Sequence, residues 1–94
     1  MKRNDKAMKG IKQELYNECG YFCWLCGQKL DKSELTGHHR IPYRICKCTK
    51  KENIYIACKH CHFDIINHIP YPSKEYEDTM EKMRTFRYNK KGRD

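Results

Sequence analysis

Hydrophobic residues recur at helical spacing near both ends of the chain. Close to the N-terminus they stand three and four residues apart, at Met8, Ile11, Leu15 and Cys19. Lysines occupy much of the remaining surface of this segment, Asn4 or Asp5 is a suitable N-terminal cap, and Gly20 is a suitable stop. The pattern predicts a basic amphipathic helix over about residues 5–18.

A second amphipathic segment lies near the C-terminus. Tyr76, Met80 and Met83 share one face, and Ser73 is a suitable N-terminal cap. Acidic residues stand early in this segment and basic residues late, as the helix dipole favours. The pattern predicts a C-terminal helix over about residues 73–88.

The intervening core, about residues 19–70, contains shorter elements. Two extended pieces, Leu35–Ile41 and Ile54–Ala57, are separated by Pro42 and a loop rich in Lys and Cys. The segment His62–His68 is suited to a short helix. These elements indicate that all 94 residues form one small α+β domain.

Composition changes this picture, because the chain has few aliphatic residues for its length. Ile, Leu, Phe and Val together supply 15 of the 94 residues. A conventional core of that size would not offset the backbone ordering entropy of about 1–2 kcal/mol per residue. The composition excludes a large α/β enzyme and a coiled coil. It also excludes a membrane protein, because no apolar run approaches about 18 residues.

Seven cysteines provide another source of stability. The basic N-terminus is followed by no apolar stretch of the kind found in secretory signals, so we expect a cytoplasmic location. In a reducing compartment cysteine pairs favour metal binding over disulfides, and an odd number of cysteines suits a disulfide framework poorly.

Four of the cysteines form two C-x₂-C pairs. Tetrahedral Zn²⁺ binds four thiolates at about 2.3 Å, and each C-x₂-C turn supplies two of them. The sequence therefore predicts one structural zinc site, formed by Cys23, Cys26, Cys58 and Cys61. Cys19, Cys46 and Cys48 remain, either as a second soft metal site or as packed and exposed thiols.

Histidines gather in the 31 residues between the two pairs and directly after the second pair. His38 and His39 are neighbours in a predicted strand, so their side chains should point to opposite sides. His62 is turned about 100° from Cys61 around a helix, and should therefore face away from the zinc. His62 can then meet a strand histidine and form a second, open metal site.

The order of these motifs resembles the HNH nucleases of the ββα-metal class. The chain has Cys23-x₂-Cys26, His38-His39-x₂-Pro42, Asn53 and Cys58-x₂-Cys61-His62 in that order, and the similarity extends over residues 23–68. The resemblance implies a ββα-metal core with a four-cysteine zinc site, here with flanking N- and C-terminal helices. It also implies a metal-dependent endonuclease that hydrolyses DNA phosphodiester bonds.

The resemblance also implies a role for each catalytic residue. His39 matches the general base, and Asn53 matches the residue that orients the hairpin carrying the base. His38 and His62 match the ligands of a catalytic divalent metal, Mg²⁺, Mn²⁺, Ni²⁺ or Zn²⁺. Two imidazoles without a carboxylate suit Zn²⁺, Ni²⁺ or Mn²⁺ better than Mg²⁺. The chain departs from the family at Ile66, where many members have His or Lys.

The charge of the chain points to a polyanionic partner. The net charge is +8, so we expect binding to the phosphate backbone of DNA and no membrane partner. Arg40, Lys50 and Lys51 are the candidate contacts, although solvated charges would have the same sequence appearance. By analogy, so short a nuclease suits a phage element and a larger phage or host complex.

Two alternatives to the endonuclease remain open at this stage. The first is a non-catalytic zinc-finger module that binds nucleic acid, and the second is a zinc-stabilised protein-interaction domain. The three histidines favour the enzyme over the binding module, because binding alone needs no open metal site. The net charge disfavours the protein-interaction domain.

A histidine base predicts a pH-dependent activity. The ordinary pKa of an imidazole is about 6.5, and only the neutral ring accepts a proton. DNA cleavage should therefore rise as the pH passes through about 6–7, measured as initial rates on plasmid DNA at constant ionic strength. A flat profile through that range would count against His39 as the base.

Overall fold

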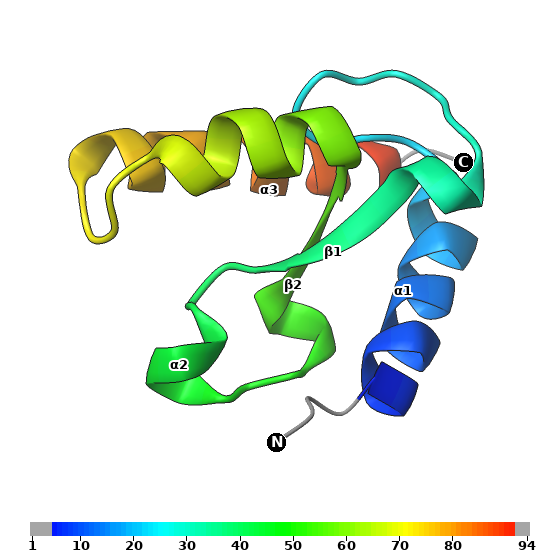
Figure 1. The fold of residues 1–94 in the computed structure, drawn as a ribbon. Coiled ribbons are helices and arrows are strands. Elements are labelled where there is room, and N and C mark those ends of the chain that lie inside the picture. The colour runs from blue at the N-terminus through cyan, green and yellow to red at the C-terminus, as the bar shows by residue number, and fades with distance from the viewer. Residues whose placement is uncertain (1–4, 92–94) are drawn as a thin grey trace.

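A β-hairpin lies at the middle of the molecule, with helices on either side of it (Figure 1). The computed structural model describes residues 5–91. The longer elements are α1 (Asp5–Cys19), β1 (Leu35–His39), α2 (Tyr43–Cys46), β2 (Ile54–Cys58) and α3 (Lys74–Lys91). Short helical turns stand between them: η1 (Lys32–Glu34), η2 (Lys51–Asn53), the π-helix η3 (His60–Ile65) and η4 (Ile66–His68).

The two strands pair antiparallel over five residues each. His38 lies opposite Tyr55 and His39 lies opposite Ile54 in the register. All five residues of β2 are buried, because α1 covers part of this strand and the rest faces the core. His38 and His39 therefore lie on β1, which pairs with the fully buried strand β2.

The core is formed where the hairpin meets the two long helices. Leu15 and Cys19 from α1 and Tyr76, Met80 and Met83 from α3 are buried, as both predicted stripes require. Trp24 is also buried, with its ring 5.6 Å from that of Tyr55. The apolar faces of α1 and α3 thus supplement the few aliphatic residues of the chain.

Gly37 lets α1 approach β1 closely. A Cβ atom at this position would lie 2.8 Å from the Met8 sulfur and 3.2 Å from a methyl group of Ile54. A side chain at this position would displace Met8 and crowd Ile54, so glycine before His38 allows the observed packing of α1 on the strand.

Several elements differ from the sequence predictions. The first strand ends at His39 rather than Ile41, since the chain turns there toward Pro42. The loop expected after Pro42 contains the helical turn α2. The helix expected over His62–His68 begins at His60 and is a π-helix up to Ile65. The C-terminal helix extends to Lys91, and the proposed cap Asn4 lies outside the described residues.

No helix within residues 5–91 is long and apolar enough to span a membrane.

Asn53 organises the connection between the strands. Its Oδ1 accepts a hydrogen bond from the Ile41 backbone N–H at 2.9 Å, and its Nδ2 donates to the carbonyls of Ile41 at 3.2 Å and Cys48 at 2.9 Å. The side chain is buried, so these bonds replace water for three backbone groups.

Asn53→Ala should destabilise the protein by about 2–4 kcal/mol, because it leaves buried backbone groups without partners. The measurement is the free energy of unfolding from urea denaturation. Asn17→Ala is the matched control, since Asn17 is exposed and its side chain, within the described residues, accepts a hydrogen bond only from Gln13. Equal effects of the two substitutions would show that the Asn53 bonds contribute little.

Candidate functional site

Four cysteine side chains meet at one point. The sulfur atoms of Cys23, Cys26, Cys58 and Cys61 all lie within 4.8 Å of one another, and the sulfurs of Cys26 and Cys58 are 4.0 Å apart. Four thiolates at about 2.3 Å from a tetrahedral ion are separated by about 3.8 Å. The four cysteines are therefore positioned to bind a metal ion.

Local backbone geometry turns the sulfurs of each C-x₂-C pair inward. The N–H groups of Cys26 and Cys61 point at the sulfurs of Cys23 and Cys58, at 3.4 Å in both cases. Gly27 has φ +80° and its N–H bonds the Cys23 carbonyl at 2.9 Å, which closes the first turn. The second turn lies at the junction of β2 with η3, so it is part of the hairpin.

The electrostatics of the cluster favour a cation. Burial raises the pKa of Cys61 far above its usual range, and the neighbouring cysteines add to this effect. Burial also acts to raise the pKa of Cys23, but backbone N–H groups outweigh it and lower the value to about 7. Negative thiolates this close together repel one another, so the four thiols do not all lose their protons without a cation. A bound metal ion would offset this repulsion.

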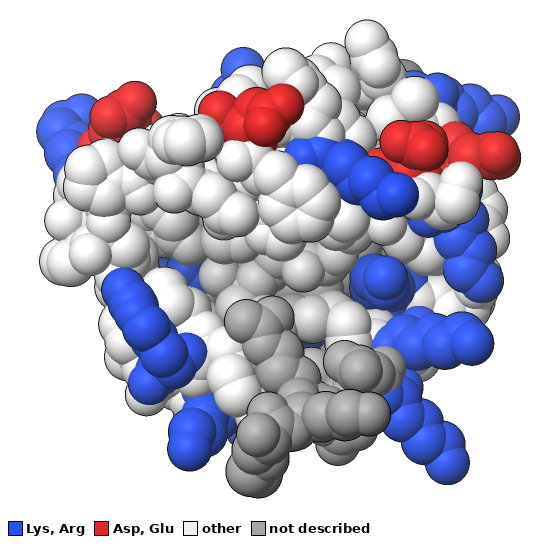
Figure 2. All heavy atoms as spheres, in the orientation of Figure 1, with Lys and Arg blue, Asp and Glu red and all other residues white. Residues whose placement is uncertain are grey.

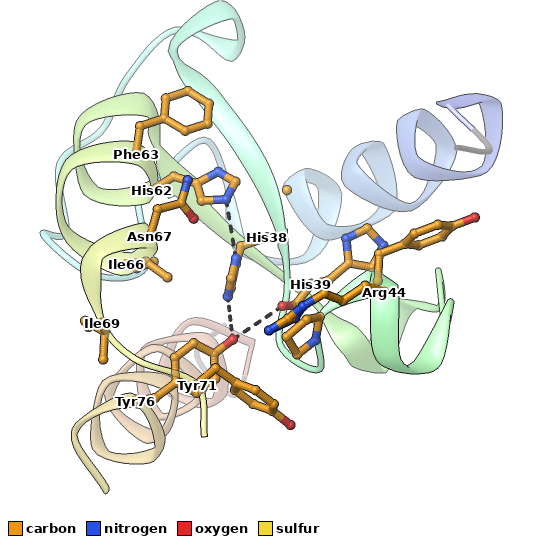
Figure 3. A pocket seen from close by; sticks show the side chains of 13 residues that line it. His38, His39, Arg44, His62, Phe63, Ile66, Asn67, Ile69, Tyr71 and Tyr76 are labelled. Atoms are coloured by element: carbon orange, nitrogen blue, oxygen red, sulfur yellow. Dashed lines mark hydrogen bonds between the residues drawn. The ribbon is translucent and has the colours of Figure 1, made fainter. Parts of the chain in front are cut away.

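A cavity of about 410 Å³ opens beside this cluster (Figure 3). Its walls come from β1, the α2 segment, the η3–η4 segment and the start of α3. The polar and aromatic lining residues are His38, His39, Tyr43, Arg44, His62, Phe63, Asn67, Tyr71 and Tyr76.

Two imidazoles face each other in the cavity. His38 Nδ1 lies 3.3 Å from His62 Nε2, and the rings meet edge to face. His38 comes from β1, and His62 comes from η3, directly after Cys61. The Cys61 sulfur joins the metal cluster while the His62 ring points into the cavity, so consecutive residues face two different sites (Figure 3).

The outer nitrogens of both rings contact hydroxyl groups. His38 Nε2 is 2.7 Å from the Tyr76 hydroxyl, and His62 Nδ1 is 2.8 Å from the Thr36 hydroxyl. Burial, followed by the nearby His62 and His39, lowers the pKa of His38 to about 3. His38 is therefore neutral at pH 7, which is the form that binds metals.

The spacing of the two inner nitrogens fits a divalent cation. Two nitrogens at about 2.05 Å from a tetrahedral ion are separated by about 3.3 Å. His38 Nδ1 and His62 Nε2 stand at that separation. Neutral imidazoles are suitable ligands for Zn²⁺, Ni²⁺ and Mn²⁺, and the cavity leaves room for further ligands.

His39 lies on a different wall of the same cavity. Its side chain is 6% exposed, its Nε2 is 3.2 Å from the Thr49 hydroxyl, and its ring packs edge to face with Tyr43. The alternation of side chains along β1 separates it from His38. The carbonyl of His39 lies 3.4 Å from the Tyr76 hydroxyl.

Arg44 lines the cavity, whereas Arg40, Lys50 and Lys51, the three candidates for DNA contact, do not, and two of these three already form ion pairs. Arg40 pairs with Glu77, and Lys51 pairs with Glu18. Lys50 is exposed and forms none of the ion pairs found within the described part of the chain. Figure 2 shows Lys and Arg over both the upper and the lower part of the face in view, and the acidic side chains along its upper part.

Sequence reasoning missed the hydroxyl groups of Thr36, Thr49 and Tyr76, each of which contacts a cavity histidine. Tyr76 was recognised only as part of an apolar stripe, and no sequence signal distinguishes its hydroxyl from that of another buried tyrosine. His68 is exposed and does not line the cavity.

The three remaining cysteines do not form one site. Cys46 and Cys48 form a disulfide, whereas buried Cys19 contacts the carbonyl of Arg87. Cys19 is therefore a packed thiol, as one of the two alternatives had it, and the disulfide of Cys46 and Cys48 fits neither alternative.

Comparison with known families identifies the class. The model of the HNH endonuclease family matches residues 23–68 of the chain. The match and the two-stranded antiparallel sheet, with four cysteines positioned to bind a metal ion, confirm the predicted fold class. No curated protein and no solved structure matches the chain in the corresponding searches.

Removal of the ion bound by the four cysteines should unfold the chain. Such an ion contributes about 10–16 kcal/mol, whereas a small domain has a net stability of about 5–15 kcal/mol. Circular dichroism during titration with a chelator would measure the loss, and mass spectrometry of the native protein would identify the ion. A chelated protein that keeps its fold and melting temperature would contradict a structural role.

Proposed function

We propose that the protein is a metal-dependent endonuclease that hydrolyses phosphodiester bonds in DNA. The observation that supports this most directly is the pair of imidazole nitrogens, 3.3 Å apart, in one cavity with a third histidine. A domain that only bound nucleic acid would not need this arrangement.

His39 is the general base of the proposed reaction. It removes a proton from a water molecule as the water oxygen attacks the phosphorus and the bond from phosphorus to the leaving 3′ oxygen breaks. The ring is held between the Thr49 hydroxyl and Tyr43, so its orientation is set before substrate binds. Asn53 supports it indirectly, because its hydrogen bonds hold the loop that follows β1.

His38 and His62 would hold the catalytic divalent cation. When bound, such a cation supplies positive charge to the scissile phosphate and to the leaving oxygen. As metal ligands both imidazoles would be neutral, so neither would bring a negative charge near the phosphate. Arg44, which lines the same cavity, adds a positive charge on the protein side.

The ion at the four cysteines is proposed to be zinc. A site of four thiolates with tetrahedral spacing is typical of structural Zn²⁺ and leaves no position for substrate. The two sites therefore have separate roles, one stabilising the fold and one serving catalysis.

DNA is the proposed substrate because the net charge is +8 and Arg44 lines the cavity. Contacts of Lys50, and of Arg40 and Lys51 after exchange of their carboxylate partners, would bind phosphates without selecting a base sequence. Binding should therefore weaken as salt concentration rises.

The test is cleavage of supercoiled plasmid with Mg²⁺, Mn²⁺, Ni²⁺ or Zn²⁺ added to protein that carries its structural ion. Wild type should cut, and His39→Ala should cut about 10²–10⁴-fold more slowly. His68→Ala is the matched control, since His68 is exposed and lies outside the cavity lining.

Two outcomes would contradict different parts of this proposal. Failure of the wild type to cut with any of the four metals would favour the alternative, a non-catalytic zinc-finger module that binds nucleic acid. Unchanged cleavage by His39→Ala would contradict only the assignment of the base.

A further inference from the structure

We propose that Tyr76 is a positioning residue that keeps the proton of His38 on Nε2 and so directs an unprotonated Nδ1 toward His62. Tyr76 belongs to α3, outside the segment that matches the HNH family. The consequence for catalysis rests on the proposed function, but the position of the proton does not.

The proton assignment follows from the contacts of one hydroxyl group. The Tyr76 oxygen lies 2.6 Å from the Arg40 carbonyl and 2.7 Å from His38 Nε2. A carbonyl only accepts hydrogen bonds, so the single hydroxyl proton of Tyr76 is donated to Arg40. The remaining contact requires His38 Nε2 to donate to the Tyr76 oxygen.

The opposite tautomer conflicts with these distances. If His38 carried its proton on Nδ1, its Nε2 would need the hydroxyl proton of Tyr76. Two oxygens would then face each other at 2.6 Å with no proton between them, an unfavourable contact in a buried site. A neutral imidazole with Nε2 protonated has its lone pair on Nδ1, which faces His62.

Thr36 has the same relation to His62. Its hydroxyl donates to the Ala57 carbonyl at 2.9 Å, so it accepts from His62 Nδ1 at 2.8 Å. His62 Nε2 then turns an unprotonated nitrogen toward His38. Two lone pairs that face each other at 3.3 Å repel unless a cation lies between them. The hydroxyls of Tyr76 and Thr36 therefore hold the two rings in the orientation that binds a cation.

The position of Tyr76 is set by the start of α3. The Tyr76 backbone N–H donates to the Ser73 hydroxyl at 3.0 Å, and the ring packs edge to face on Tyr71. The next residue, Glu77, pairs with Arg40, whose carbonyl receives the Tyr76 hydroxyl. The helix is thus attached to the end of β1 at two consecutive residues.

The first test is the protonation pattern of the His38 ring, measured by long-range ¹H–¹⁵N NMR on protein with the four-cysteine ion bound and no second cation added. In the wild type, His38 Nε2 should be protonated and His38 Nδ1 unprotonated. Tyr76→Phe should populate the other tautomer while keeping its melting transition. Tyr16→Phe is the matched control, since Tyr16 is also buried and its hydroxyl bonds no described residue.

A wild-type ring protonated on Nδ1 would overturn the proposal. An identical His38 pattern in wild type and Tyr76→Phe would also overturn it. Neither result depends on whether the protein cuts DNA.

The second test is the affinity for Mn²⁺, measured by the loss of the free-ion EPR signal on the same proteins. Tyr76→Phe and Thr36→Val should weaken binding by about 10–100-fold, and Thr36→Ser should restore it. Unchanged affinity in Tyr76→Phe, together with lost affinity in His38→Ala, would overturn the role of Tyr76 at the cation site. If wild type and His38→Ala bind Mn²⁺ equally, the proposed catalytic site fails, and the NMR result still decides the role of Tyr76.

Discussion

The convergence of four cysteine sulfurs is the constraint on which the rest of the structure depends. It brings the turn at Cys23 and Cys26 against the junction of β2 with η3, although 31 residues separate Cys26 from Cys58. Cys58 ends β2 and Cys61 lies in the first turn of η3, so the same cluster sets where the strand stops and the helix starts. A chain with so few aliphatic residues needs such an attachment, because its buried apolar surface alone is small.

The cluster and the cavity share one stretch of backbone. His62 follows Cys61, so the geometry that turns one side chain toward the sulfurs turns the next toward His38. The π-helical winding of η3 accompanies this change of direction, and such windings occur frequently at functional sites. The cysteine cluster and the cavity are therefore linked through the backbone from Cys61 to His62, and they share no side chain.

The charges of the molecule serve two purposes. Arg40 and Lys51 join α3 and α1 to the segments that follow and precede the strands, through Glu77 and Glu18. Partly exposed ion pairs of this kind contribute little stability, so their main effect is to orient neighbouring elements. Other lysines and arginines contribute to the net charge of +8, on which the proposal of DNA as the partner rests.

The sequence by itself determined the similarity to the HNH family over residues 23–68, the four clustered cysteines, the fold class and the apolar stripes of both terminal helices. These features depend on spacing and periodicity, which are local properties of a chain. The π-helical form of η3, the turn α2 and the ion pair of Arg40 were decided by tertiary packing. The hydroxyl of Tyr76 illustrates the difference, because it reaches His38 from 38 residues away. A contact of that kind depends on how α3 packs against the hairpin, and residue type and spacing do not encode it.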